Sequence, residues 1–322
     1  MKQKGKPMDF GLHLGTFVSG PDDIRTLAVH AERLGFSYLG FSDHVVIARQ
    51  IASRYPYNES GDLQGLPTGF CLDQLACLAY AAAVTDRIRL MTSVMVLPHR
   101  PPVLTAKLLA TVDVLSKGRV TAGVGTGWLA EEMALLGSPP YEQRGAASNE
   151  YIEAFRALWT QAEPQYAGKF VSIDNVMFEP KPVQKPLPIW VGGEGSAARR
   201  RAGRLGDGWY PTIRNPSEPL NLPAKLAEHL GDVHRHAEAA GRDPASIDVG
   251  IFAPRSNVGT AKTDKDGERL PFTGSVEQIA EDASAFGRAG VNHVMLGLEA
   301  GDLQDYMARM ESFARQVMPL VG

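Results

Sequence analysis

Asp43 and His44 stand next to each other, separated only by Ser42 from a short apolar run, residues 38–41. An imidazole can donate or accept a proton near neutral pH, and a neighbouring carboxylate can orient it. An isolated Asp-His pair more often only caps the segment that follows it. At the carboxyl end of a buried strand, where α/β barrels place their catalytic groups, the catalytic interpretation is favoured instead. We therefore expect His44 to act as a proton donor or acceptor, with Asp43 beside it.

A glycine-rich turn follows another apolar run, residues 189–191, which is bounded by prolines. We expect Ser196 to cap a helix after these glycines, with the arginines at 199–201 facing solvent. Free N–H groups at a helix N-terminus, together with the helix dipole, bind phosphate. Any strand-to-helix turn favours glycine, so this stretch alone supports phosphate binding and a plain turn equally. The expected phosphate-binding segment consists of Gly192, Gly193, Glu194, Gly195 and Ser196.

The composition excludes several classes of partner. Of the 322 residues 44% are hydrophobic and 21% charged, and the formal net charge is -3. This balance gives no reason to expect nucleic acid or an anionic membrane as a partner. No apolar run reaches the length of a membrane span, and the basic N-terminus leads into no secretory apolar segment. We therefore expect a cytoplasmic protein that acts on a small molecule.

Metal chemistry fits the sequence poorly. Cys71 and Cys77 match no zinc spacing, and we expect them as buried thiols on different faces of a helix. No nucleophile elbow or phosphate-binding loop of the nucleotide hydrolases appears. Four further histidines fall on expected helices rather than at strand ends: His30, His229, His234 and His236. We expect no metal, and an organic cofactor as the source of the chemistry.

The elements that must position these groups alternate along the chain. Apolar runs predict strands at residues 10–14, 38–41, 88–97, 119–124, 189–191, 209–212, 247–252 and 292–298. Helical periodicity predicts helices at residues 22–34, 72–84, 101–115, 131–137, 142–160, 196–205, 222–240, 276–289 and 302–317. A hairpin or extended excursion is expected at 168–179, and the polar loop from 254 to 271 is long enough to form a lid.

Eight strands alternating with helices predict a closed (β/α)8 TIM barrel. We expect one domain over residues 1–322, with insertions after strands 2, 4 and 7. An open doubly wound sheet is the alternative, but its usual G-x-G-x-x-G motif does not follow the first strand. In a barrel the strand ends that form the site are Asp43-His44, residues 92–94, residues 125–128 and Gly192-Gly193.

Several motifs occur in a fixed order along nearly the whole chain. They are SDH at 42–44, MTSVMVLPHRPP at 91–102, LSKGRVTAGVGTGW at 115–128, ALW at 157–159, PKPVQKPLPIWVGG at 180–193 and RAGRLGDGW at 201–209. Together they make the chain resemble the luciferase-like monooxygenase superfamily, the bacterial luciferase-like flavin and deazaflavin enzymes. The branch that it resembles most uses coenzyme F420, an 8-hydroxy-5-deazaflavin.

The resemblance implies a role for each strand end. Gly192 and Gly193 would bind the cofactor phosphate through backbone N–H groups. The Ser93–Val94 peptide matches the position of a non-prolyl cis bond that lies against the back of the flavin ring. Asp43 and His44 would lie beside the ring, and Thr126 and Gly127 would line the cofactor. The resemblance also implies a homodimer.

Trp128 departs from one branch of this family. Sugar-phosphate dehydrogenases of the superfamily carry an acidic glutamate directly after the GTG triplet, where this chain has Trp128. An indole cannot transfer a proton, but it can form an apolar wall. Trp128 is therefore a candidate for the substrate-binding site, although it could equally belong to the core. We expect a substrate more apolar than a sugar phosphate.

Three functions are considered for a chain with this resemblance. The first is hydride transfer between coenzyme F420 and an alcohol, an aldehyde or an activated double bond. The alternative is an FMN-dependent monooxygenase that uses O2 and takes reduced flavin from a partner reductase. The third is a flavin-binding barrel without turnover, against which the intact Asp43-His44 pair argues.

Overall fold

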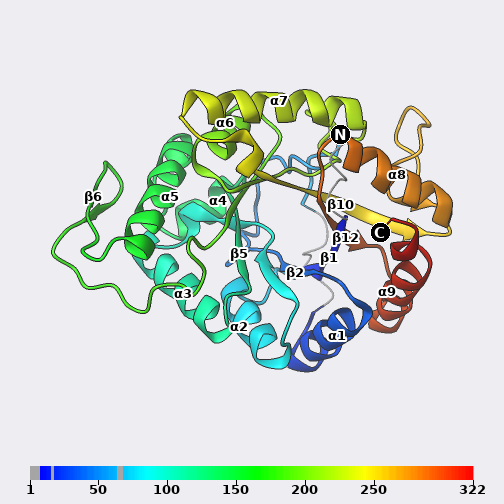
Figure 1. Ribbon diagram of the computed structural model, residues 1–322, viewed down its shortest axis with the longest axis horizontal. Coiled ribbons are helices and arrows are strands. Elements are labelled where there is room, and N and C mark those ends of the chain that lie inside the picture. The colour runs from blue at the N-terminus through cyan, green and yellow to red at the C-terminus, as the bar shows by residue number, and fades with distance from the viewer. Residues whose placement is uncertain (1–7, 16–17, 64–67, 322) are drawn as a thin grey trace.

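The computed structural model describes residues 8–15, 18–63 and 68–321. Within them, parallel strands surrounded by helices close into a barrel (Figure 1). The barrel strands, in the order in which they pair, are β1 (Asp9–His13), β2 (Tyr38–Phe41), β3 (Arg89–Thr92), β5 (Val120–Gly125), β8 (Ile189–Gly192), β9 (Gly208–Tyr210), β10 (Asp248–Val258) and β12 (His293–Leu298). Pairing of β12 with β1 completes the circle. The predicted (β/α)8 barrel is confirmed, and an open sheet is excluded.

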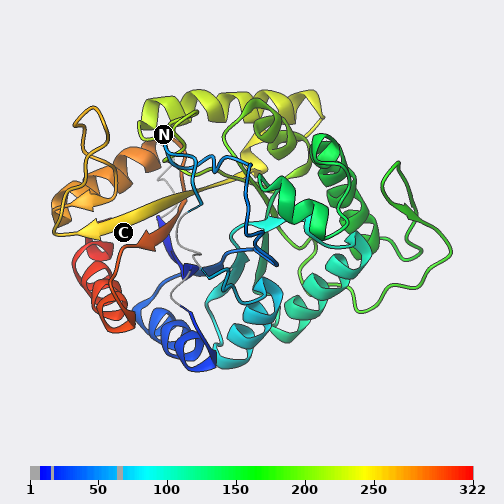
Figure 2. The same cartoon turned by 180° about the vertical axis from the view of Figure 1, so that it is seen from behind.

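Helices follow the strands, and all of them except the short α4 cover the outside of the barrel (Figures 1 and 2). They are α1 (Pro21–Leu34), α2 (Gln74–Val84), α3 (Pro102–Leu115), α4 (Ala130–Leu135), α5 (Arg144–Thr160), α6 (Ser196–Leu205), α7 (Pro223–Ala239), α8 (Val276–Arg288) and α9 (Leu303–Gln316). Short 3-10 turns lie at Leu97–His99, Tyr141–Gln143, Pro244–Ser246 and Met318–Leu320. No helix in the described ranges is long and apolar enough to cross a membrane.

Local sequence explains where these helices begin and end. Pro21 opens α1, and Gly35 ends it in the left-handed conformation, with φ 89°. Helix α8 begins with a capping box in which the side chains of Ser275 and Gln278 each accept a hydrogen bond from the other's backbone amide. Such signals fix helix ends independently of tertiary packing.

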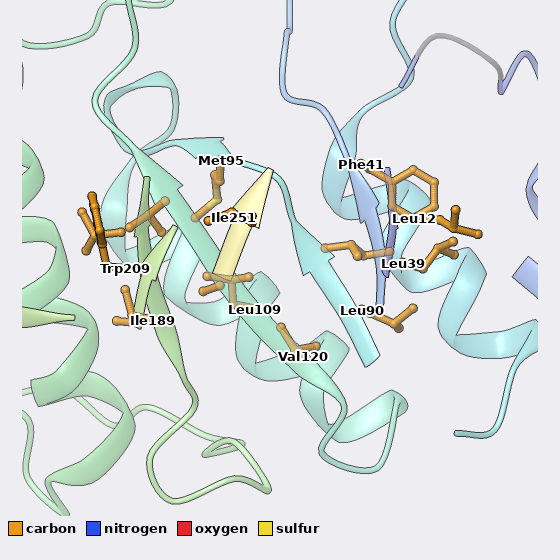
Figure 3. Close-up of a cluster of buried hydrophobic side chains, with 14 of the residues drawn as sticks. Leu12, Leu39, Phe41, Leu90, Met95, Leu109, Val120, Ile189, Trp209 and Ile251 are labelled. Atoms are coloured by element: carbon orange, nitrogen blue, oxygen red, sulfur yellow. The ribbon is translucent and has the colours of Figure 1, made fainter. Parts of the chain in front are cut away.

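The main core lies between the strands and the helices. Figure 3 shows part of it, a buried cluster that includes strand residues such as Leu39 and Ile189 and also Leu109 of α3. Strand residues that alternate with these form a second cluster inside the barrel: Tyr38, Met91, Trp190, Tyr210 and Met295. The sequence runs are apolar nearly throughout because both faces of each strand are covered.

Trp190 fills the barrel interior. Its ring centroid lies 5.6 Å from that of Tyr38 and 6.2 Å from that of Tyr210. Two glycines on neighbouring strands make room for it, because a Cβ at Gly208 or Gly250 would come within 2.7 Å of the indole ring. The cavity beside it measures only about 10 Å³. The barrel is therefore closed below its carboxyl-terminal mouth.

Three expected elements differ from the structure. The third strand, predicted over 88–97, ends at Thr92 and resumes as the short β4 (Met95–Val96), which pairs with β5. The excursion after α5 contains the hairpin of β6 (Tyr166–Ala167) and β7 (Ser172–Ile173), a little before the predicted range. The polar loop predicted from 254 begins later, because β10 continues to Val258 and pairs with β11 (Thr273–Gly274).

Two predictions about side chains were wrong. The arginines at 199–201 do not all face solvent, because Arg201 is buried and donates to Asn149 Oδ1 and the Gly145 carbonyl. Arg199 forms an ion pair of 3.1 Å with Asp232 of α7. Cys71 precedes α2, so the two cysteines do not lie on two faces of one helix. Cys77 is buried as expected, whereas Cys71 is half-buried.

Candidate functional site

His44 follows β2 and pairs with a carboxylate from another part of the chain. Its Nδ1 lies 2.8 Å from Oε2 of Glu132, on α4. Oε1 of the same carboxylate accepts hydrogen bonds from the backbone amides of Val45 and Val46, at 2.6 and 3.1 Å. The Glu132 side chain is fully buried. This network fixes the imidazole in one orientation.

Glu132 remains charged in this environment. Burial opposes its ionisation, but the hydrogen bonds from His44 and from the Val45 amide outweigh burial and lower the pKa of Glu132. Nδ1 of His44 is therefore the donor in the pair, and Nε2 is the ring atom left for proton transfer. Among residues with assigned positions, none forms a hydrogen bond with Nε2.

A cavity of about 150 Å³ lies between the carboxyl ends of β1 and β2 and the insertion after β2. His44 and Tyr55 line it, together with both cysteine residues. Its remaining lining residues are Gly15, Val18, Phe41, Ser42, Leu63, Phe70 and Leu72. His44 therefore borders a space that a small molecule can enter, and its side chain is only 15% exposed.

Asp43 does not contact His44 as its partner, which corrects the sequence-based expectation. Its Oδ2 accepts from the Val96 amide at 2.8 Å and from Nη1 of Arg100 at 2.9 Å. Its Oδ1 accepts from Nη2 of Arg100 at 2.8 Å. Arg100 also donates to Asp73, the residue that caps α2. Asp43 is thus a buried anion that holds β2, β4 and α2 together at the mouth.

The Ser93–Val94 peptide is cis, as the resemblance implied. The Ser93 hydroxyl shares a hydrogen bond of 2.9 Å with the Tyr210 hydroxyl. Val94 projects between the ends of β5 and β8. Its methyl groups lie so close to Gly125 and Gly192 that a Cβ there would be only 3.0 or 3.1 Å away. Ser93 and Val94 therefore occupy the centre of the barrel mouth.

The glycine-rich turn connects β8 to α6. Gly193 has a φ of 112°, which a residue with a side chain rarely adopts. The helix cap is Gly195 rather than Ser196, and within the described residues no capping side chain binds the first amides of α6. Ser196 is exposed, and a Cβ at Gly195 would meet no atom within 4 Å. The turn thus offers open backbone N–H groups to an anion.

Glu194 turns its side chain away from this turn. Its carboxylate accepts from the Thr212 amide at 2.8 Å and from the Asn215 side-chain amide at 2.6 Å. Burial raises the pKa of this carboxyl, although both hydrogen bonds favour the charged form. Only the backbone of Glu194 is placed to contact a ligand at the turn.

Thr126, Gly127 and Trp128 follow β5 at the mouth, and all three are partly exposed. Gly127 has a φ of 79°, and a Cβ there would lie 2.6 Å from Val96. The Trp128 ring meets the edge of Tyr55 at 5.2 Å, and Tyr55 contacts Tyr57 at 5.5 Å. Trp128 therefore belongs to an aromatic group with the insertion after β2, not to the barrel core.

His13, at the end of β1, was missed by the sequence reasoning. Its Nε2 shares a hydrogen bond of 3.1 Å with the Ser42 hydroxyl, and its ring lies 4.9 Å from that of Phe252. Burial lowers the pKa of His13 to about 4, against a hydrogen bond with the Ser93 backbone that raises it. Catalytic groups were sought at the carboxyl ends of the predicted strands. His13 would have been among them if the first strand had been predicted to end one residue earlier.

Comparison with known proteins agrees with this geometry. Residues 8–256 match the family model of the luciferase-like monooxygenases. An uncharacterized protein of Mycobacterium tuberculosis (strain ATCC 25618 / H37Rv) is 35% identical over 259 residues, 80% of this chain and 88% of that protein. The FMNH(2)-dependent dimethylsulfone monooxygenase of Pseudomonas putida is 28% identical, covering 92% of this chain and 87% of that protein.

The fold is also that of a solved enzyme structure. An F420-dependent secondary alcohol dehydrogenase in complex with an F420-acetone adduct superposes with a TM-score of 0.76 and 19% identity, covering 98% of this chain and 99% of that chain. The barrel, the cis peptide after β3 and the family match over most of the chain lead to one conclusion. The chain belongs to the luciferase-like monooxygenase family, a family of oxidoreductases and monooxygenases.

Proposed function

We propose that the protein is an oxidoreductase that transfers a hydride between coenzyme F420 and a small organic substrate. The observation that carries this proposal is the His44–Glu132 pair, with the carboxylate fully buried and the imidazole bordering the cavity. A deazaflavin supplies two-electron hydride transfer and reacts poorly with oxygen. Oxidation of an alcohol by this route releases a proton that a nearby base must accept.

His44 is the group that would hold that proton. Glu132 accepts the Nδ1 hydrogen bond, so Nε2 faces the substrate as a base in the oxidising direction and as an acid in the reducing direction. The negative charge of Glu132 stabilises the imidazolium that forms. The Glu132 carboxylate does not have to move during proton transfer, because the backbone amides of Val45 and Val46 already hold it in place.

The residues of the mouth fit a phosphate-bearing tricyclic cofactor. The open N–H groups at the start of α6 suit its phosphate, and Gly192, which has no side chain, leaves its own backbone open to close approach. Ser93 and Val94 would lie against one face of the ring system. Thr126 and Gly127 would line its edge, with Asp43 holding the strands that carry these contacts.

A second candidate is an FMN-dependent monooxygenase that uses reduced flavin and O2. The relative from Pseudomonas putida, whose name states FMNH(2) dependence, is 28% identical over 92% of this chain, which favours this activity. Both cofactors share the phosphate and the ring shape, so the same mouth suits either. In this case a separate reductase would supply the reduced flavin.

Titration of the apoprotein with each coenzyme distinguishes the two. We expect saturable changes in the absorbance and fluorescence of F420, and substrate-dependent loss of the oxidised F420 absorbance with an alcohol under anaerobic conditions. Binding of FMN without binding of F420 would contradict the proposal in favour of the monooxygenase. A protein that binds neither coenzyme would contradict both activities.

We also propose that the protein works as a homodimer. Leu104, Leu108 and Leu115 on α3 are 36–60% exposed and lie on one side of this helix. Near them an arm after α5, which carries β6 and β7, extends outward from the barrel (Figures 1 and 2). Met177, on this arm, is 99% exposed. An exposed apolar surface of this kind suits a second copy of the chain.

A further inference from the structure

Arg214 lies at the mouth, beside the carboxyl ends of β9 and β10. Thr212 forms a parallel bridge with Phe252 of β10, and the Ile213 amide donates to the Phe252 carbonyl at 3.0 Å. Glu194 holds the same segment from the other side through Thr212 and Asn215. The backbone that carries Arg214 is therefore fixed at a strand end.

The guanidinium of Arg214 is largely buried and has unused donors. Its Nε and Nη2 atoms are inaccessible to solvent, and neither has a hydrogen-bond partner in the described part of the chain. Burial, together with the positive charge of Arg255, lowers the pKa of Arg214 to about 10, so it is still charged near neutral pH. A buried cation without an acceptor destabilises the folded protein. Its position is explained if an anion occupies this place during function.

Arg255 supplies a second cation from the adjacent strand. It stands at an irregularity of β10, between Pro254 and Ser256, where its φ is 57°. A bulge of this kind redirects a side chain at the rim of a sheet. Arg255 is exposed, and no hydrogen bond to its side chain is found among the residues described. By the register of the bridge at Thr212, Arg214 lies opposite the segment that begins at Pro254.

The nearby acid, Glu299, offsets the charge of this pair only in part, because it raises the pKa of Arg214 by less than burial and Arg255 lower it. Its amide donates to Ser256, which places it beside β10, but its carboxylate already lies 2.8 Å from Nζ of Lys262. The charge of Arg255 also acts on Tyr55, whose ring lines the cavity with His44. The two arginines thus face the same mouth as the candidate proton-transfer group.

We propose that Arg214 and Arg255 bind an anionic group of the substrate, a carboxylate or a phosphate. This inference rests on the proposed function, because the molecule concerned is the one that His44 serves. The aromatic group at Trp128 and Tyr55 would contact the apolar part of the same molecule. The expected apolar substrate is thereby refined to an amphipathic acid, held at its charged end by two guanidinium groups.

The test uses inorganic phosphate as a probe on protein saturated with F420, so that the glycine-rich turn is already occupied. We expect Arg214→Met to weaken phosphate binding at least tenfold by calorimetry and Arg255→Met several-fold. Neither variant should change F420 affinity more than twofold. The melting temperature of Arg214→Met should be equal to or above that of the wild type, since an unpaired buried charge is removed. Arg288→Met, an exposed change at the last turn of α8, is the control and should change nothing.

Three outcomes would overturn the inference. Unchanged phosphate affinity in Arg214→Met would show that the arginine binds no anion. Weakened F420 affinity would assign the anion to the coenzyme instead of the substrate. A lowered melting temperature would give Arg214 a structural role. If the wild type binds neither F420 nor FMN, the proposed function fails separately, and the same phosphate comparison on the apoprotein still decides whether the arginine pair binds an anion.

Discussion

The proton-transfer proposal depends on two side chains that are far apart in the sequence. We expect His44→Ala to lower kcat by about 100-fold or more, the usual contribution of a general acid or base. Glu132→Gln keeps the size of the side chain but removes the charge that orients and stabilises the imidazole, and should lower kcat about tenfold. Steady-state kinetics with F420 absorbance as the signal measures both effects.

His99 provides the matched control for this prediction. Its Nε2 lies 3.9 Å from the same Glu132 oxygen that His44 contacts, Oε2, but His99 is absent from the cavity lining. We expect His99→Gln to retain kcat within a few-fold. Full turnover in His44→Ala, with coenzyme affinity unchanged, would remove His44 from the mechanism.

His13 makes stability depend on pH in a defined window. Its pKa is about 4 in the folded protein and 6.5 in an unfolded chain. Between these values the unfolded chain binds a proton that the folded protein does not, so the free energy of unfolding decreases as the pH falls. We expect a loss of about 1–3 kcal/mol between pH 7 and pH 4.5 from this residue.

Urea unfolding at the two pH values measures this loss. His13→Gln keeps a polar partner for Ser42 but cannot titrate, so its unfolding free energy should depend less on pH than that of the wild type. Other buried histidines contribute equally to both proteins and cancel in the comparison. An identical pH dependence in the two would contradict the assignment.

At the level of elements, α4 fastens the insertion after β2 to the barrel mouth. Glu132 accepts from Val45 and Val46, and its neighbour Glu131 accepts from Ala52 and Ser53 at 2.7 and 3.0 Å. Burial opposes ionisation of Glu131, but its hydrogen bonds lower its pKa to about 2. A short helix with two adjacent acids thus holds the segment that carries Tyr55.

We expect Glu131→Ala to release this segment without unfolding the barrel. The amides of Ala52 and Ser53 should exchange with solvent at least tenfold faster, because each loses its acceptor, and stability should fall by about 1 kcal/mol. Hydrogen exchange followed by mass spectrometry measures the first effect. Glu59→Ala, an exposed change in the same insertion, should leave the exchange unchanged, and equal exchange in both variants would contradict the role of Glu131.

The elements themselves could largely be predicted from the sequence, since periodicity and capping act locally. Helix α1, which begins at Pro21 and is followed by Gly35, was expected at nearly its observed bounds. Strand β10 was ended too early, because Pro254 is typical of loops and only pairing with β12 continues the strand past the irregularity at Arg255. Pairing partners of this kind are not encoded in local residue preferences.

The partners within the site could not be predicted for a related reason. Glu132 lies 88 residues from His44, and the adjacent Asp43 was the only carboxylate that spacing could suggest. Similarly, the sequence predicted that Arg201 faces solvent with its neighbours, but residues of α5 cover its side chain in the fold. The cis bond at Ser93–Val94 was found through family resemblance, not through residue chemistry.

For the whole molecule, the exposed leucines of α3 predict self-association. We expect the wild type to elute as a dimer in size-exclusion chromatography with light scattering. Leu104→Glu should shift it to a monomer, because a charge cannot be buried between two apolar faces without a partner. Leu222→Glu, an equally exposed leucine before α7, is the matched control. A monomeric wild type would contradict the proposed homodimer.

Because Trp190 fills the barrel interior, the order in which ligands bind and leave is constrained. Among the described residues, indole and phenol rings fill the lower barrel, so the site is open only at the carboxyl-terminal rim. Coenzyme, reactant and product must all pass through it. The coenzyme is the largest of the three, so it has to bind first and leave last. We therefore expect an ordered kinetic mechanism instead of random binding.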